Sequence, residues 1–138
     1  MRATETYQSR YRCAEDQVAD NEEAVGHGQL SVTRADVDGI TVLRLHGEVD
    51  YQSAVALTRA MPPTDPTAGH RIVVDLSQVT FMDSSGVNAL IAGHRATQSA
   101  DGWLRLAGAG GAALRTVQMV GLDTLITCHP TVRDAVAA

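Results

Sequence analysis

Alternation of apolar and polar residues predicts a β-hairpin near residue 30. Residues Leu30 to Ala35 alternate, and Ile40 to Leu45 form a second apolar run, both typical of strands. Between them, Asp36-Val37-Asp38-Gly39 supplies turn residues, including a glycine that adopts positive φ without strain. We therefore predict two antiparallel strands, Leu30–Ala35 and Ile40–Leu45.

A helix is predicted after the second strand. Gly47 permits a sharp exit from that strand, and Asp50 is a residue type that caps helices. Three apolar residues then recur at helical spacing: Ala54, Leu57 and Met61. Prolines from Pro62 onward end this helix and, with Gly69, form a loop.

The segment from Arg71 onward begins with a predicted buried strand. Ile72-Val73-Val74 is a β-branched run of the kind that lies in strands covered on both faces. We expect Asp75 to close this strand and to have a structural role. Three apolar residues lie in the linking segment that we expect to follow: Val79, Phe81 and Met82.

The next four residues, Asp83-Ser84-Ser85-Gly86, mark the start of a helix. An apolar stripe at helical spacing follows them: Val87, Leu90, Ile91 and His94. Asp83 and Ser84 are both N-cap types, so one of them should accept the first free backbone N–H groups. The helix should run to about Ser99, because Asp101-Gly102 is a stop signal. The pattern thus predicts a serine hydroxyl at a helix N-terminus.

The C-terminal third continues the alternation of strands and helices. We predict a strand at Trp103–Ala107, a helix marked by Leu114, Val117 and Val120, a strand at Leu125–Cys128 and a helix at Thr131–Ala137. This order predicts one α/β domain over residues 30–138, with a mixed sheet, the N-terminal hairpin and about four helices.

Residues 1–29 differ from the rest of the chain in composition. This segment holds six acidic residues and three arginines, so its charge is six less three, or −3, and it has few apolar residues. We expect an acidic, flexible tail outside the domain. A helix from Arg10 to Asn21 remains an alternative.

Composition excludes several classes of function. With 138 residues, 44% hydrophobic and 4% aromatic, the chain can bury one aliphatic core. No run approaches the roughly 20 apolar residues of a membrane span, and we find no signal peptide, so we expect a cytoplasmic protein without membrane insertion. The net charge of −5 argues against a nucleic-acid partner. All 11 basic residues are arginine, which excludes a P-loop lysine and Schiff-base chemistry.

The sequence predicts no catalytic centre, cofactor or metal. Ser84 is not in a Gly-x-Ser-x-Gly elbow. The nearest histidine, His94, lies on the apolar stripe, where we expect a satisfied and partly buried imidazole. The five histidines are scattered, and only His129 has a cysteine, Cys128, beside it. The Gly108-Ala109-Gly110-Gly111 segment is too short for a dinucleotide fingerprint.

The two cysteines leave one question open. Cys128 is expected to be a small core residue. A redox role for Cys13 with Cys128 would require the N-terminal segment to fold back. The sequence does not decide between a monomer and a weak dimer.

A resemblance to a known family rests on the central segment. Val74-Asp75-Leu76-Ser77, followed by Phe81-Met82-Asp83-Ser84-Ser85-Gly86, resembles the signature of the STAS domain, and in particular that of bacterial anti-sigma-factor antagonists. Further similar segments are Gly47-Glu48-Val49-Asp50, Leu106-Ala107-Gly108, Val120-Gly121-Leu122 and Pro130-Thr131-Val132-Arg133-Asp134-Ala135. The likeness covers about Leu30 to Ala138 and leaves out residues 1–29.

The resemblance implies a partner-switching regulator of transcription without catalysis of its own. By this likeness, Ser84 is phosphorylated by a serine kinase that is also the anti-sigma factor. The unmodified protein binds this kinase and frees the sigma factor, and a serine phosphatase resets the cycle. The implied partner-binding residues are Asp50, Asp83, Ser84, Ser85 and Gly86. The alternative is a STAS scaffold or regulatory module in a stress-signalling or transport complex, in which the serine is not a switch.

Overall fold

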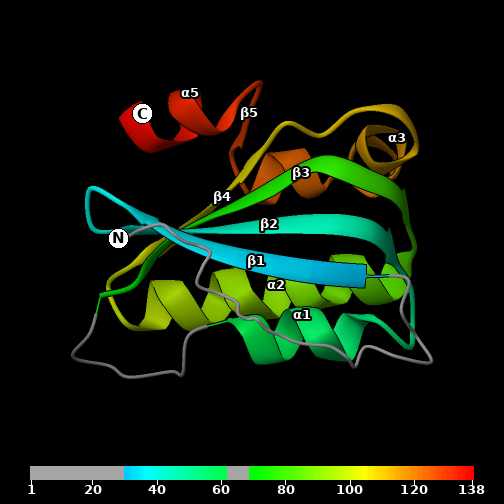
Figure 1. Ribbon diagram of the computed structural model, residues 1–138, viewed down its shortest axis with the longest axis horizontal. Helices are drawn as coiled ribbons and strands as arrows, with labels where there is room; N and C mark the ends of the chain where they lie inside the picture. Colours follow the sequence, from blue (N-terminus) through cyan, green and yellow to red (C-terminus); the bar gives the residue numbers. More distant parts are fainter. Residues whose placement is uncertain (1–29, 62–68) are drawn as a thin grey trace.

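Strands and helices alternate along the part of the chain that our computed structural model describes, residues 30–61 and 69–138 (Figure 1). In chain order the elements are β1 (Leu30–Val37), β2 (Ile40–Val49), α1 (Ala54–Ala60), β3 (Arg71–Met82), α2 (Ser84–Ser99), β4 (Trp103–Ala107), α3 (Gly111–Met119), α4 (Leu122–Leu125), β5 (Cys128–His129) and α5 (Val132–Ala137). The predicted tail at 1–29 and most of the predicted proline-rich loop, residues 62–68, lie outside the described residues.

The strands form one mixed sheet in the order β1-β2-β3-β4-β5, which confirms the predicted α/β class. β1 and β2 are antiparallel, and the other neighbours are parallel. The turn of the hairpin is shorter than predicted, because Asp36 and Val37 still pair with β2. Only Asp38 and Gly39 form the turn, with φ of 52° and 78°. Two positive φ values fit the type I′ turn that matches the twist of paired strands.

β3 is longer than predicted, and the expectation that Asp75 closes it is wrong. Asp75 is the last β3 residue to pair with β4, but β3 continues beside β2 as far as Met82. β2 likewise continues to Val49, and its register with β3 shifts between Gly47 and Glu48. This register shift marks a bulge within β2, and Gly47 lies at the bulge with a φ of 117°. It does not provide the predicted exit.

Both faces of the sheet are covered near its centre. Figure 1 shows α1 and α2 below the sheet and α5 above it. Leu43, Leu45, Val74 and Leu76 belong to the same buried cluster as Leu57 of α1 and Leu90 of α2. On the opposite face, Val42 and Val73 pack with Ala135 of α5. The prediction that Ile72-Val73-Val74 is buried on both faces is confirmed.

The C-terminal third differs from the prediction in an additional helix and in the bounds of the last strand. Leu122–Leu125 is a short helix, α4, entered through Gly121 at a φ of 74°, and β5 contains only Cys128 and His129. The predicted last strand exists, but its predicted bounds Leu125–Cys128 are wrong, since only Cys128 belongs to β5. Val120 is exposed and does not extend the buried stripe of α3. Cys128 is also exposed, so it is not a core residue.

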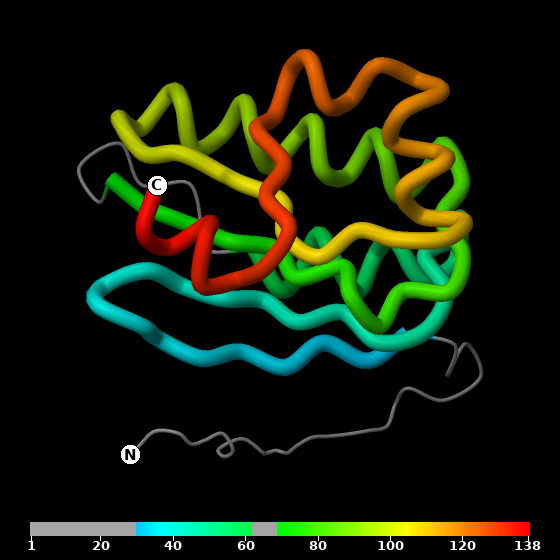
Figure 2. Tube along the Cα trace, turned by 90° about the horizontal axis from the view of Figure 1, so that it is seen from above, coloured from blue at the N-terminus to red at the C-terminus, as the bar shows by residue number. Residues whose placement is uncertain are grey.

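The last helix returns over the sheet. Figure 2 shows the red C-terminal segment crossing back over β3 and β4, which α5 contacts. Thr131 caps α5 by accepting the Asp134 N–H at 3.1 Å, close to the predicted helix start. Within the described ranges, no helix has the length and apolar character needed to cross a membrane.

Candidate functional site

Ser84 is the first residue of α2, and its side chain is exposed. Of the two predicted cap candidates, Asp83 and Ser84, the preceding residue Asp83 is the N-cap. Its Oδ1 accepts the backbone N–H groups of Ser85 at 2.8 Å and Gly86 at 3.4 Å. Because Asp83 satisfies these donors, the Ser84 hydroxyl is not needed as a cap. It is therefore exposed to solvent without a capping role.

Gly86 allows the first turn of α2 to lie against the ends of β2 and β3. A Cβ atom at this position would lie 2.7 Å from Val49 Cγ1 and 2.9 Å from Met82 Cγ. Both distances are shorter than side-chain atoms tolerate, so any side chain would push the helix outward. Gly86 thus determines how close Ser84 sits to the sheet. Ser85 is half-buried beside it.

Backbone hydrogen bonds hold the segment before Ser84 on two sides. The Asp83 N–H donates to the Val49 carbonyl oxygen at 3.1 Å, which joins the end of β2 to the start of α2. The Thr116 hydroxyl of α3 donates to the Met82 carbonyl oxygen at 3.1 Å. Three elements that are distant in sequence therefore fix the position of Ser84. The sequence pattern gave no sign of the role of Thr116, because its contact is non-local.

Asp50 follows Val49 directly, just as Ser84 follows Asp83. The two residues therefore lie on either side of the hydrogen bond between the Asp83 N–H and the Val49 carbonyl oxygen. Its Oδ1 accepts the Ser53 N–H at 2.9 Å and the Ser53 hydroxyl at 3.0 Å. The backbone N–H of Ser53 lowers the pKa of Asp50 most, and the Ser53 hydroxyl adds to this effect. Asp50 was predicted to cap α1, but it does not occupy the N-cap position of this helix. Ser53 occupies it, and Asp50 holds the turn before it.

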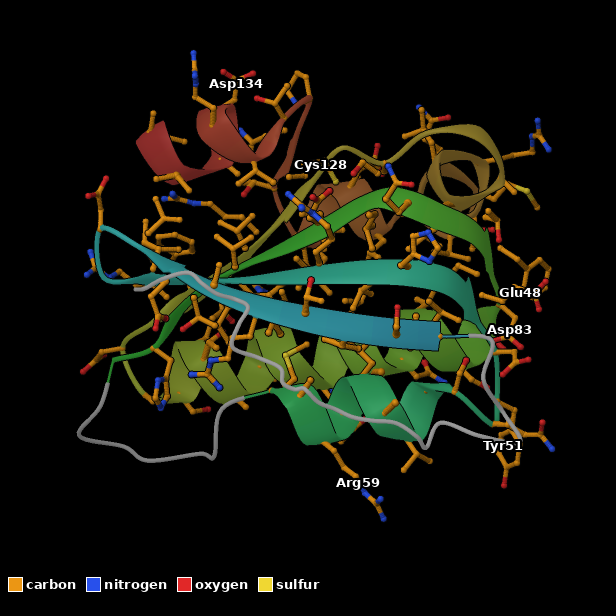
Figure 3. The ribbon with its side chains drawn as sticks, in the orientation of Figure 1. Glu48, Tyr51, Arg59, Asp83, Cys128 and Asp134 are labelled. Atoms are coloured by element: carbon orange, nitrogen blue, oxygen red, sulfur yellow. The ribbon has the colours of Figure 1, made fainter. Side chains whose placement is uncertain are left out.

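The surface around Ser84 is acidic and partly apolar. Figure 3 shows Glu48, Tyr51 and Asp83 at the same end of the molecule. Tyr51 is 80% exposed, and Phe81 is also exposed. Sequence analysis did not single out Glu48 or Tyr51 as site residues. The only available signal was that Tyr51 belongs to no apolar repeat, although it is a large side chain.

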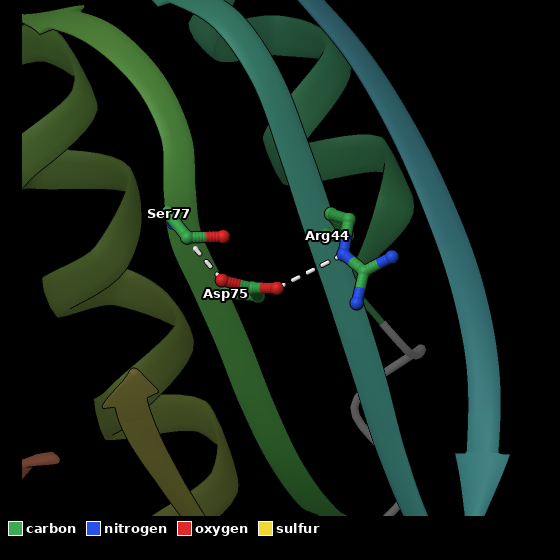
Figure 4. A network of polar contacts seen from close by, with 3 residues as sticks. All are labelled: Arg44, Asp75 and Ser77. Carbon is green, nitrogen blue, oxygen red and sulfur yellow. Dashed lines mark hydrogen bonds and ion pairs between the residues drawn. The ribbon is translucent and has the colours of Figure 1, made fainter. Parts of the chain in front are cut away.

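Asp75 lies on the sheet face opposite α1 and α2, outside this site. It is 3% exposed, and its two carboxylate oxygens accept the Arg44 Nε–H and the Ser77 N–H, each at 2.9 Å (Figure 4). A buried carboxylate needs such partners. The contacts support the expected structural role.

His94 cannot act as a base for Ser84. It is buried on α2 ten residues further along, which corresponds to about 15 Å of helix axis. Its Nδ1 is buried without a hydrogen-bond partner, so the expectation of a satisfied imidazole is wrong for this atom. Among the described residues, no three His, Cys, Asp or Glu side chains are grouped to hold a metal ion.

Cys128 carries a thiol of low reactivity. Although the residue as a whole is exposed, partial desolvation of its thiol, followed by the negative charge of Asp123, raises the pKa of this thiol above its ordinary value of 9.0. The nucleophilic thiolate is therefore scarce near neutral pH. Cys13 lies outside the described residues, so a pairing of the two cysteines stays an open alternative.

Comparison with known proteins identifies several relatives. The family model of the STAS domain matches residues 32–135. The anti-sigma-F factor antagonist RsfB of Mycobacterium tuberculosis is 34% identical over 110 residues, which cover 77% of this chain and 86% of RsfB.

Two solved structures share this fold. The crystal structure of an anti-sigma factor antagonist from Mycobacterium paratuberculosis has a TM-score of 0.68 at 29% identity, covering 78% of this chain and 92% of that one. The unphosphorylated form of the anti-sigma factor antagonist SpoIIAA has a TM-score of 0.62 at 22% identity, covering 77% and 93%. The match to SpoIIAA supports the fold alone.

Proposed function

Because this chain belongs to the STAS domain family, we propose that it is a cytoplasmic anti-sigma-factor antagonist. In its unphosphorylated form it binds an anti-sigma serine kinase, which then releases its sigma factor. The observation that carries this proposal is the exposed Ser84 at the start of α2, in a chain that is 34% identical to an anti-sigma-F factor antagonist. The protein acts as ligand and substrate of the kinase and has no catalytic role of its own.

Phosphorylation of Ser84 switches the protein off. The kinase transfers the γ-phosphoryl group of ATP to the Ser84 Oγ, the hydroxyl proton is lost, and ADP leaves. The new group carries about −1.5 to −2 charges near neutral pH. A serine phosphatase restores the hydroxyl by hydrolysis.

The fold tolerates this modification. At the N-terminus of α2 the helix dipole favours a negative group by about 0.3–1 kcal/mol. The neighbouring Asp83 carboxylate opposes it by like-charge repulsion. Because Ser84 is exposed, water solvates the phosphate. The two local effects nearly cancel, so the free energy of unfolding changes little.

Binding to the kinase, in contrast, does not tolerate phosphorylation of Ser84. A kinase surface that closes over a neutral hydroxyl leaves the phosphate uncompensated, which costs roughly 3–5 kcal/mol. This corresponds to about two to four decades in affinity. The modification therefore acts on the complex and leaves the domain folded.

The other proposed partner-binding residues act around Ser84. Asp83 is half-buried at the start of α2, and Asp50 lies across the Val49–Asp83 hydrogen bond. Both contribute negative charge to the surface that faces the kinase. Ser85 and Gly86 contribute mainly by shaping the first turn, since their N–H groups are engaged by Asp83.

The test combines intact mass with binding affinity. The wild type, Ser84→Ala, Ser84→Asp and the matched neighbour variant Ser85→Ala are incubated with Mg-ATP and each anti-sigma serine kinase of the same genome. We expect one phosphate on the wild type and on Ser85→Ala and none on Ser84→Ala, with Ser84→Asp binding more weakly than Ser84→Ala. If no kinase binds or modifies the wild type, the proposal fails.

A further inference from the structure

A groove runs between α1 and α2 beside the first turn of α2. Its volume is about 540 Å³. The residues that line it recur three or four positions apart, so each helix presents one stripe to it: Tyr51, Val55 and Arg59 from the α1 side, and Ser85, Ala89 and Ala92 from α2. Ser85 follows Ser84 directly, so the groove adjoins the switch serine.

Small residues create this groove. Ala89 and Ala92 contribute only methyl groups on the α2 side, whereas Tyr51 and Val55 stand beside them on the α1 side. Tyr51 is 80% exposed and Val55 is 51% exposed. Single exposed apolar side chains are ordinary on protein surfaces. Here two of them, four positions apart, border a hollow with an apolar floor.

We propose that this groove is a second contact site for the anti-sigma kinase, which inserts an apolar side chain between α1 and α2. Arg59 then pairs with a carboxylate that the kinase carries beside that side chain. This inference rests on the function proposed above and extends it from Ser84 to a neighbouring surface.

Continuity and charge favour the kinase as the occupant. A kinase that reaches the Ser84 hydroxyl already covers Ser85, which lines one end of the groove. Glu48 and Asp83 are acidic near that end, whereas Arg59 places a positive charge further along α1 (Figure 3). A complementary partner therefore presents a basic, then an apolar, then an acidic group. Tyrosine and arginine are also the residue types enriched at interface hot spots.

The two contacts are separable. The groove contact depends on shape and on the charge of Arg59, whereas the contact at Ser84 depends on its phosphorylation. Changes in the groove should therefore weaken binding of the unphosphorylated protein without changing which serine is modified.

The test measures kinase affinity by calorimetry in a Ser84→Ala background, where no phosphate is added. Ala92→Gln fills the groove, and its control is Ala56→Gln, at an exposed alanine of α1 that does not line the groove. Tyr51→Ala removes one wall, and its control is Met119→Ala on α3, where the side chain is 79% exposed. We expect the two groove variants to bind at least about tenfold more weakly and the controls to stay within about twofold. Circular dichroism establishes that each variant is folded.

Arg59→Glu tests the charge, with Arg95→Glu as the control at an exposed position of α2 outside the groove. We expect at least a tenfold loss for the first and less than a threefold loss for the second. If a kinase binds the parent protein and all groove variants equally, this inference is overturned while the proposed function stands. If Tyr51→Ala leaves kinase affinity intact but abolishes self-association in sedimentation, the occupant is a second copy and the inference is again overturned. If no kinase binds the wild type, both fail together.

Discussion

The backbone N–H of Asp83 donates to the carbonyl oxygen of Val49 at 3.1 Å and so joins the start of α2 to the end of β2. Val49 is the last residue of β2, and Asp83 is the N-cap of α2. Asp50 directly follows Val49, and Ser84 directly follows Asp83. The orientation of the candidate switch therefore depends on the pairing of β2 with β3, and changes in the sheet should reach Ser84 through this bond.

Gly86→Ala should destabilise the protein although alanine is the better helix former. Helix propensity alone predicts a gain of roughly 0.5–1 kcal/mol for this change. The new Cβ would meet Val49 Cγ1 at 2.7 Å and Met82 Cγ at 2.9 Å, however, and such overpacking costs typically 1–3 kcal/mol. We expect the clash to dominate, so the free energy of unfolding in urea should fall.

The control for Gly86→Ala is Gly110→Ala. Apart from its own two chain neighbours, no residue has an atom within 4 Å of a Cβ built at Gly110, whose φ is −150°. We expect a change below about 1 kcal/mol there, since only the N-cap preference is affected. A stabilising Gly86→Ala would contradict the account of the close approach.

Asp83→Ala should lower the free energy of unfolding by about 1 kcal/mol, the usual cost of losing an N-cap. The Ser85 N–H would lose its 2.8 Å acceptor. Asp83→Asn is the matched control, because its side-chain oxygen can accept the same bond without the charge. Urea unfolding of both variants checks this, and equal losses would show that the charge, not the acceptor geometry, is responsible.

Arg44→Ala should cost about 1.5–3 kcal/mol, the range for hydrogen bonds to charged groups. The Asp75 carboxylate is buried, and its Oδ2 would lose the Arg44 Nε–H. Because the Arg44 side chain is 58% exposed, water replaces part of this contact, so we expect the lower end of the range. Arg95→Ala, at an exposed position of α2, should stay within about 0.5 kcal/mol. Equal losses for the two variants in thermal unfolding would exclude a special role for the Arg44–Asp75 pair.

Local signals predicted much of the site. Asp83 and Ser84 are both N-cap types followed by an apolar stripe; the structure assigns the cap to Asp83 and confirms the predicted helix end at Ser99. These features depend on neighbours within a few residues. The position of Ser84 was predictable for the same reason.

Non-local contacts explain what the sequence did not show. Aspartate is depleted in strands, but β3 continues past Asp75 because β2 provides partners as far as Met82. The run Leu125–Cys128 has the apolar content of a strand, but Leu125 ends the short helix α4, which the chain enters through Gly121 at positive φ, so β5 begins only at Cys128. The exposure of Tyr51 depends on how α1 and α2 pack, which no local pattern encodes.

Asp50 should make stability depend on pH. Its hydrogen bonds from Ser53 place the pKa of the folded state below the ordinary value of 3.8. The unfolded state therefore binds a proton more readily, and the contribution of Asp50 to stability is complete above the unfolded pKa and lost as pH falls through the folded pKa. We expect the difference in free energy of unfolding between the wild type and Asp50→Asn to shrink as pH falls from about 5 to below 4. Ser53→Ala should keep part of this dependence, because the backbone N–H of residue 53, the largest cause of the lowered pKa, remains. A difference that stays constant with pH would show that the Asp50 carboxylate is not held by Ser53 in solution.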